Sequence, residues 1–87
     1  MYHVELTADA ERDLAQLDRQ VAQRLFKRLE WLEANFTHIT PEPLKGSLAD
    51  LYKFRVGNYR VLYDIYPDDQ VLLVHRVRHR SEVYKEK

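Results

Sequence analysis

The chain has 87 residues, of which 45% are hydrophobic, with 14 Lys/Arg, 14 Asp/Glu and no Cys. This length predicts one domain, residues 1–87, with a single core. A chain without Cys has no disulfide framework and no thiolate chemistry, and no apolar run approaches the roughly 20 residues that span a bilayer. The N-terminal segment also lacks the basic and then apolar pattern of a signal peptide. We therefore expect a soluble, cytoplasmic protein without a membrane partner.

The charges cancel overall but are spread unevenly along the chain. Residues 1–44 carry 5 Lys/Arg and 8 Asp/Glu, a net charge of −3, whereas residues 45–87 carry 9 and 6, a net charge of +3. A neutral chain argues against a general nucleic-acid-binding protein. The basic C-terminal half nevertheless predicts that an anionic partner binds there.

The N-terminal half has the hydrophobic pattern of one strand and two helices. Residues 2–6 alternate between apolar and polar side chains, which predicts a short strand. Thr7 and Asp18 are typical N-caps for the helices that follow them. Each helix has an apolar stripe with spacings of three and four residues. The stripes consist of Ala10, Leu14 and Leu17 in the first helix and Val21, Leu25, Leu29, Leu32 and Phe36 in the second, and Phe26 and Trp31 lie outside them.

Residues 51–64 have the pattern of a β-hairpin with a two-residue turn. Gly57 and Asn58 tolerate the positive φ angles of such turns. The turn fixes the register, so Arg55 is expected directly opposite Arg60. Two facing arginines repel each other, which predicts an anionic ligand between them. Alternation places Tyr52, Phe54, Val61 and Tyr63 on one face of the hairpin and Lys53, Arg55 and Arg60 on the other.

The rest of the chain completes a small sheet. Residues 35–43 contain two prolines and predict a linker. Residues 71–78 begin almost wholly apolar, as a central strand covered on both faces does. Residues 79–87 form a polar tail with at most a helical turn. The expected order is β-α-α-β-β-β, an α+β domain in which two N-terminal helices, an αα-hairpin, pack on a small antiparallel sheet.

The register of the last two strands stays open. If the turn at residues 67–69 pairs Tyr66 with Val71, regular alternation places Arg78 on the face opposite Arg60. A one-residue bulge or a looser turn would pair Arg60 with Arg78 instead.

Several catalytic chemistries lack their residues in this sequence. The four His residues have no metal-ligand spacing, neither Ser has the context of a nucleophile, and two glycines make no phosphate-binding loop. We therefore expect neither a metal nor another cofactor. The remaining feature is a set of fixed cations with one tyrosine on the tail, which favours phosphate binding or phosphate chemistry.

Four segments of the chain match a known family. They are Leu44-Lys45-Gly46, Tyr52-Lys53-Phe54-Arg55-Val56, Tyr59-Arg60-Val61-Leu62-Tyr63 and Arg80-Ser81-Glu82-Val83-Tyr84. On these segments the chain resembles the RelE/ParE superfamily of bacterial toxins, and within it the RelE branch of mRNA-cleaving ribonucleases. The last segment is the most specific, because ParE relatives share similar strands. The resemblance implies a RelE-like fold and a type II toxin-antitoxin toxin that enters the 30S A site of the ribosome and cuts the bound mRNA codon. It also implies a cognate, RelB-like antitoxin.

The resemblance implies a catalytic set at Lys53, Arg55, Arg60, Arg78 and Tyr84. Cleavage by the 2′-hydroxyl of the RNA requires a base, an acid and cations around the phosphorane, and no metal. The three arginines would clamp the phosphate while Lys53 and Tyr84 share proton transfer. Arg55 stands where RelE has a second lysine, and a guanidinium can stabilise charge but cannot act as a base.

Other residues near this set are candidates for supporting roles. His79 stands where RelE has an acid and is a candidate for proton transfer. We expect RNA contacts from Lys45, Arg76 and Arg80, although structural roles for Arg76 and Arg80 stay equally open. Tyr84 has the alternative of a tail anchor that packs on the sheet.

Two other functions stay open at this point. A ParE-like toxin would inhibit DNA gyrase by binding, without a catalytic set. A pure binding module would only form a complex with its antitoxin. Mapping of messenger cleavage and a supercoiling assay would separate the three functions.

Overall fold

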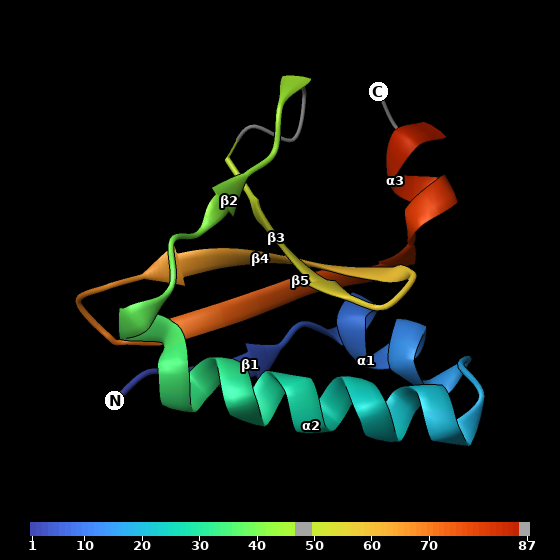
Figure 1. Cartoon of the computed structure of the whole chain (residues 1–87), viewed down its shortest axis with the longest axis horizontal. Coiled ribbons are helices and arrows are strands. Elements are labelled where there is room, and N and C mark those ends of the chain that lie inside the picture. The colour runs from blue at the N-terminus through green and yellow to red at the C-terminus, as the bar shows by residue number, and fades with distance from the viewer. Residues whose placement is uncertain (47–49, 86–87) are drawn as a thin grey trace.

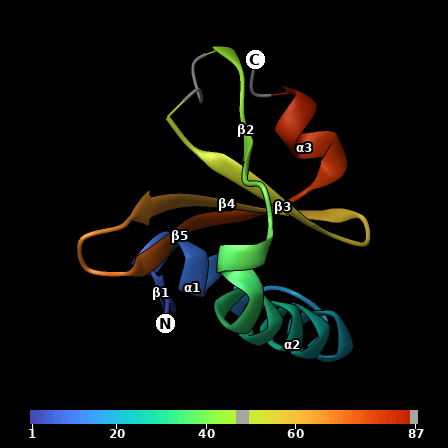
Figure 2. The same ribbon diagram turned by 60° about the vertical axis from the view of Figure 1, so that its left-hand side comes forward.

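The structure, a computed structural model, describes residues 1–46 and 50–85, the last three of these by their backbone alone. Within these residues the chain forms one sheet of five strands. Helices α1 and α2 lie on one side of the sheet and α3 on the other (Figures 1 and 2). The α+β class is confirmed. The elements are β1 (His3–Leu6), α1 (Ala8–Ala15), α2 (Arg19–Asn35), the 3-10 helix η1 (Phe36–His38), β2 (Glu42–Pro43), β3 (Tyr52–Val56), β4 (Tyr59–Tyr66), β5 (Val71–His79) and α3 (Arg80–Lys85).

The first two helices begin at the predicted caps. The Thr7 hydroxyl accepts a hydrogen bond from the Ala10 N–H at 3.1 Å, and the Asp18 carboxylate accepts one from the Gln20 N–H, also at 3.1 Å. Each bond satisfies a backbone donor that has no partner inside its helix. None of the described helices is long and apolar enough to cross a membrane.

The core lies between the sheet and the apolar stripes of α1 and α2. Leu32, Val61 and Leu72 are completely buried there. Tyr63 is buried beside them, and this burial, with Tyr52 and Glu42 nearby, raises the pKa of Tyr63 to about 12. Phe26, which lies outside the apolar stripe of α2, does not extend this core. The buried core residues are Ala10, Leu14, Leu25, Leu29, Leu32 and Phe36 from the helical segments and Val56, Val61, Tyr63, Leu72, Val74 and Val77 from the strands.

The sheet is mixed, which corrects the expected antiparallel arrangement. The strand order is β1-β5-β4-β3-β2, and β1 runs parallel to β5. Parallel strands need a long connection between them, and the two helices and the hairpin supply it here. The predicted position of β5 as a central strand is confirmed, because it lies between β1 and β4.

The predicted linker contains a short strand that the sequence analysis did not expect. Glu42 pairs with Lys53 and Pro43 with Tyr52, which makes β2 the edge strand next to β3. Proline is tolerated there because an edge strand does not need every backbone N–H for the sheet.

The hairpin of β3 and β4 has the predicted register. Val56 pairs with Tyr59 and Arg55 with Arg60 across the turn. Of the two turn residues only Gly57 has a positive φ, +58°. This is the pattern of a type II′ turn, whose twist matches that of the flanking strands.

A bulge in β5 settles the register that the sequence left open. Tyr63 pairs with Val74 and Leu62 with Arg76, so His75 is the extra residue. The pairing beyond the bulge is therefore shifted by one residue, as a β-bulge requires.

Candidate functional site

Three arginines form a row across three adjacent strands, called the arginine row here. Arg55 on β3 pairs with Arg60 on β4, and Arg60 pairs with Arg78 on β5. Paired residues point to the same face of a sheet, and Val61, next to Arg60, is buried in the core on the opposite face. The arginine row therefore lies on the face away from α2, and alternation along β3 places Lys53 on that face too.

The row is partly shielded from solvent. Arg60 is 4% exposed, and its Nη1 donates a hydrogen bond to the Tyr59 carbonyl at 3.3 Å. Arg78 Nη1 lies 3.9 Å from a carboxylate oxygen of Glu82, and its side chain is 19% exposed. Shielding strengthens the interaction of these guanidinium groups with any anion that enters, because fewer water molecules screen the charges.

Lys53 lies at the end of the row next to β2. Its Nζ lies 4.0 Å from a carboxylate oxygen of Glu42, whose side chain is 69% exposed. An exposed pair at this distance contributes little to stability, so Lys53 remains available to a stronger anionic ligand.

Helix α3 lies on the side of the sheet away from α1 and α2 (Figures 1 and 2). The pairing of the strands places the arginine row on that side too. It follows β5 directly, and the Arg80 N–H at its start donates a hydrogen bond to the Asn58 carbonyl at 2.7 Å. Tyr84 belongs to this helix, but its side chain lies outside the described residues. The role of Tyr84 therefore stays a prediction.

His79 is not brought together with the arginine row. It pairs with Tyr59, and the two rings meet edge to face with centroids 5.4 Å apart, on the core side of the sheet. The His79 ring accepts a hydrogen bond from the Ser81 N–H at 3.3 Å, while the His79 N–H donates to the Glu82 carboxylate at 3.0 Å. The ring thus caps the second residue of α3, and the carboxylate of the third residue accepts from the cap residue in return, as in a capping box. The structure therefore shows His79 at the start of α3 rather than beside the arginines.

Arg76 has a structural partner that the sequence analysis missed. Its Nε and Nη2 donate to the two carboxylate oxygens of Asp13 on α1, at 2.9 and 3.1 Å, and the Val77 N–H donates to the same carboxylate at 2.9 Å. Partial burial alone would raise the pKa of Asp13, but these hydrogen bonds and the charges of Arg76 and Arg78 lower it. Asp13 thus joins α1 to β5 next to the bulge.

The two other predicted RNA contacts lie outside the row. Lys45 and Arg80 are both exposed, on the segment after β2 and at the start of α3. Their roles stay predictions.

The arrangement suits the binding of a phosphate group. Guanidinium groups donate paired hydrogen bonds that match phosphate oxygens, and here three of them lie on adjacent strands. Arg55 is exposed, Arg78 is partly shielded and Arg60 is buried. Among the residues that the structure describes, no group of three or more His, Cys, Asp or Glu could hold a metal ion.

The fold and this surface agree with the comparison with protein families. A family model described as the ParE toxin of a type II toxin-antitoxin system, parDE, matches residues 4–84. The chain therefore belongs to the RelE/ParE superfamily of type II toxin-antitoxin toxins, as the sequence predicted.

Individual relatives place it with the RelE toxins. The chain is 37% identical to the toxin RelE of Mycobacterium tuberculosis, over 97% of this chain and 87% of that protein. Its fold matches that of the RelBE2 toxin-antitoxin complex of M. tuberculosis with a TM-score of 0.80 and 30% identity, over 91% of this chain and 98% of the other. The isolated RelE toxin of Escherichia coli matches with a TM-score of 0.73 and 28% identity, over 99% and 94% of the two chains. The protein is a toxin of the RelE family.

Proposed function

We propose that this toxin is a ribosome-dependent endoribonuclease that cleaves the mRNA codon in the A site by attack of the 2′-hydroxyl, without a metal. The observation that supports this proposal is the arginine row. Like charges directly opposite each other in a sheet are destabilising. Here they face each other in both strand pairs, between Arg55 and Arg60 and between Arg60 and Arg78. A bound phosphate would offset this repulsion, and the doubly charged phosphorane of the cleavage reaction would offset it further.

The residues of the face divide between charge stabilisation and proton transfer. Arg60 and Arg78, which are shielded from water, would hold the two non-bridging oxygens of the scissile phosphate, and Arg55 would stabilise the same charge from the exposed end of the row. Lys53 and Tyr84 can both exchange protons and would serve the 2′-hydroxyl and the leaving 5′-oxygen. The ribosome would hold the RNA strand in place, which supplies orientation that a small open surface cannot.

A cognate antitoxin of the RelB type would inhibit this activity. The RelBE2 protein of M. tuberculosis, whose fold this chain matches, was crystallised as a toxin-antitoxin complex. We infer that the antitoxin of this chain presents an acidic or amphipathic segment, because the face around the arginine row is positively charged. Co-expression with the neighbouring small open reading frame should yield a stable complex.

The proposal is tested by mapping mRNA 5′ ends after incubation with programmed ribosomes. We expect cuts inside the A-site codon, and a loss of about 100-fold or more in rate for Arg78→Ala, as for other groups that stabilise developing charge. Arg60→Lys and Tyr84→Phe should also slow cleavage, and the lysine variant keeps a cation at the buried position. Full activity in all three variants would contradict the assignment.

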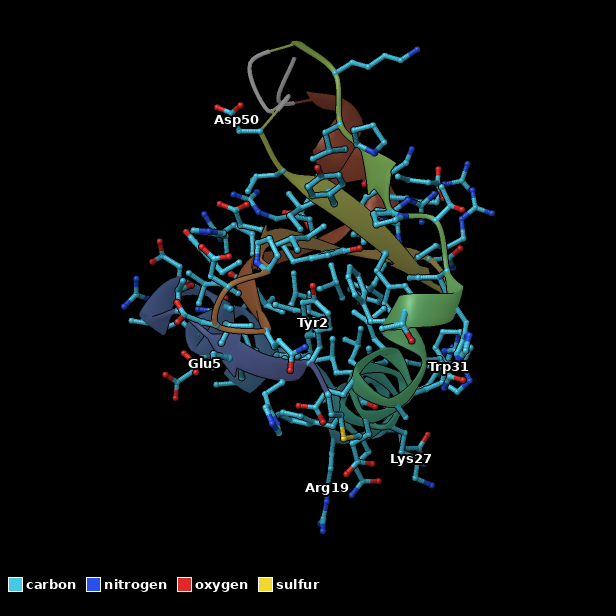
Figure 3. The ribbon with its side chains drawn as sticks, turned by 90° about the vertical axis from the view of Figure 1, so that its left-hand side faces the viewer. Tyr2, Glu5, Arg19, Lys27, Trp31 and Asp50 are labelled. Atoms are coloured by element: carbon cyan, nitrogen blue, oxygen red, sulfur yellow. The ribbon has the colours of Figure 1, made fainter. Side chains whose placement is uncertain are left out.

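Arg19→Ala is the matched control for these variants. Arg19 is an exposed arginine at the start of α2, and it projects away from the sheet (Figure 3). This variant should cleave at the rate of the unchanged protein. Circular dichroism of each variant separates a loss of activity from a loss of fold.

The alternative function is inhibition of DNA gyrase by binding. The description of the matching family model names a ParE toxin, and ParE-like relatives act on gyrase without cleaving RNA. Relaxed plasmid with intact messengers after induction would favour this alternative. A protein without any effect on growth would instead be a binding module for its antitoxin.

A further inference from the structure

Arg28, Trp31 and Phe54 form a second feature, called the Trp31 cluster here. The Trp31 and Phe54 rings are nearly parallel, with an angle of 7° between their planes and centroids 6.2 Å apart. The Arg28 guanidinium carbon lies 4.5 Å from the Trp31 centroid and 5.4 Å from that of Phe54. Trp31 remains 39% exposed. The cluster therefore presents a flat aromatic surface with a cation attached to it.

The cluster adjoins the arginine row. It lines an open recess between α2 and the sheet, and both Lys53 and Arg55 line the same recess. The recess lies at the start of β2, because it is lined by Glu42, the first residue of that strand, and by residues 39–41 before it. Beyond this point β3 has no neighbour on that edge, since β2 pairs only with its first two residues. A ligand can thus reach from the arginine row around the edge of β3 to Trp31 without leaving the surface.

Core packing does not account for the position of Trp31. The buried stripe of α2 is complete without it, and Figure 3 shows Trp31 on the flank of the helix. An exposed indole beside three cationic side chains combines the two features that bind single-stranded nucleic acid, a stacking surface and a charged track for the backbone.

We propose that the Trp31 cluster is a stacking platform for one base of the RNA strand whose phosphate lies on the arginine row. This inference rests on the proposed function, and it adds a contact with a nucleotide that flanks the cleaved linkage. Glu42 also lines the recess, where its carboxylate would repel a phosphate but can accept a hydrogen bond from an amino group of a base. The chemistry of the recess thus favours a base there, with the phosphates on the cations.

The chain offers an internal probe, because Trp31 is its single Trp. The experiment titrates the free protein at low salt with a hexanucleotide that carries 2′-O-methyl groups, which prevent attack by the 2′-oxygen. A dye at the 3′ end reports binding by anisotropy, while the emission of Trp31 reports stacking. We expect quenching of Trp31 with the same midpoint as the rise in anisotropy. The same oligonucleotide with abasic sites should bind without quenching.

Substitutions separate stacking from general binding. Trp31→Ala should weaken binding about 5- to 150-fold, the range for loss of one stacked base, and Trp31→Phe should restore part of it. Phe26→Ala is the matched control. Phe26 is an aromatic residue on the same helix, 48% exposed, but it lies in a different recess, beside β1. This variant should bind RNA as the unchanged protein does.

The inference is overturned if Trp31 emission stays constant while anisotropy saturates, if no RNA binding occurs up to millimolar concentration, or if Trp31→Ala and Phe26→Ala bind equally. A change in Trp31 emission with the antitoxin but not with RNA would also overturn it, and would assign the cluster to a protein partner. Cleavage by Trp31→Ala on ribosomes keeps the two proposals apart. If ribosomal cleavage still depends on Arg78 but RNA does not quench the emission of Trp31, the stacking platform is rejected and the nuclease proposal stands. If RNA quenches Trp31 but no cleavage occurs on ribosomes, the nuclease proposal is rejected and the platform stands.

Discussion

The two faces of the sheet are built from the same three strands under opposite physical requirements. On the face toward α2, Val61 and Val77 pair with each other and are buried in the core. In the adjacent pair on the same two strands, Arg60 and Arg78 point to the other face. Burial of the valines stabilises the fold, whereas the facing arginines oppose it.

This difference shows that a strand can carry stability and binding independently. Successive side chains point to opposite faces, so alternate positions are free to meet different demands. Substitutions on the core face should therefore lower stability, and some substitutions on the arginine face should raise it while lowering activity. The predictions below test that contrast, in order of expected size.

The largest effect is expected on the core face, for Leu72→Ala. Leu72 is completely buried in the center of the sheet. Removing its side chain should lower the free energy of unfolding by about 2–5 kcal/mol, measured by urea denaturation. Leu73→Ala is the control, since Leu73 is the next residue, points to the other face and is only half-buried. Equal losses in the two variants would contradict the assignment of faces.

The next effect is expected where α1 joins β5, for Asp13→Asn. The amide cannot match the Arg76 guanidinium with two charged acceptor atoms, and the Val77 N–H loses a charged acceptor as well. We expect a loss of about 1–3 kcal/mol in the free energy of unfolding. Asp9→Asn is the control, because Asp9 is an acid on the same helix whose salt bridge with Arg12 is exposed. A loss as large in this control would mean that the helix, not the contact with β5, is responsible.

The same carboxylate predicts a pH dependence. The pKa of Asp13 is lowered from 3.8 in the folded protein, so the unfolded chain takes up its proton at a higher pH than the folded protein does. The contribution of Asp13 to stability is thus present above about pH 4 and is lost as the pH falls through the folded pKa. Unfolding midpoints measured from pH 2 to 6 should fall less steeply at the acidic end for Asp13→Asn.

The smallest effect has the opposite sign and is expected on the arginine face, for Arg55→Thr. Removing one of two facing cations should raise the free energy of unfolding by about 0.2–1 kcal/mol, and threonine favours strands. Cleavage on ribosomes should fall in the same variant. Arg55→Lys keeps the charge and should leave stability unchanged. A destabilised threonine variant would argue that the arginines of the row do not repel each other.

Local signals in the sequence were enough for one hairpin and not for the other. Gly57 and Asn58 fix the register of β3 and β4 within a few residues. The pairing of Arg55 with Arg60 could therefore be predicted from the sequence. The register of β4 and β5 depends on the bulge at His75, and β5 is held beside that bulge by Asp13, far away in the chain. Alternation alone could therefore not decide where Arg78 points.

Two other features, the contact of Asp13 with Arg76 and strand β2, could not be predicted from the sequence for related reasons. An acid on a short helix is usually solvated, so nothing in the pattern marked Asp13 as the partner of Arg76. Strand β2 has two residues, one of them proline, which is too short for a periodic signal. The helix caps and the core were predictable because both follow from short, regular spacings.

The central place of β5 has a consequence for how the protein is made. Thr7 donates a hydrogen bond to the carbonyl of His75, 68 residues further along the chain. During synthesis β5 is made after the other strands, and until then β1 and β4 lack the strand that lies between them. Contacts over such long separations form slowly. The nascent chain thus lacks Arg78 beside Arg60 until β5, the last strand of the sheet in chain order, has been synthesised.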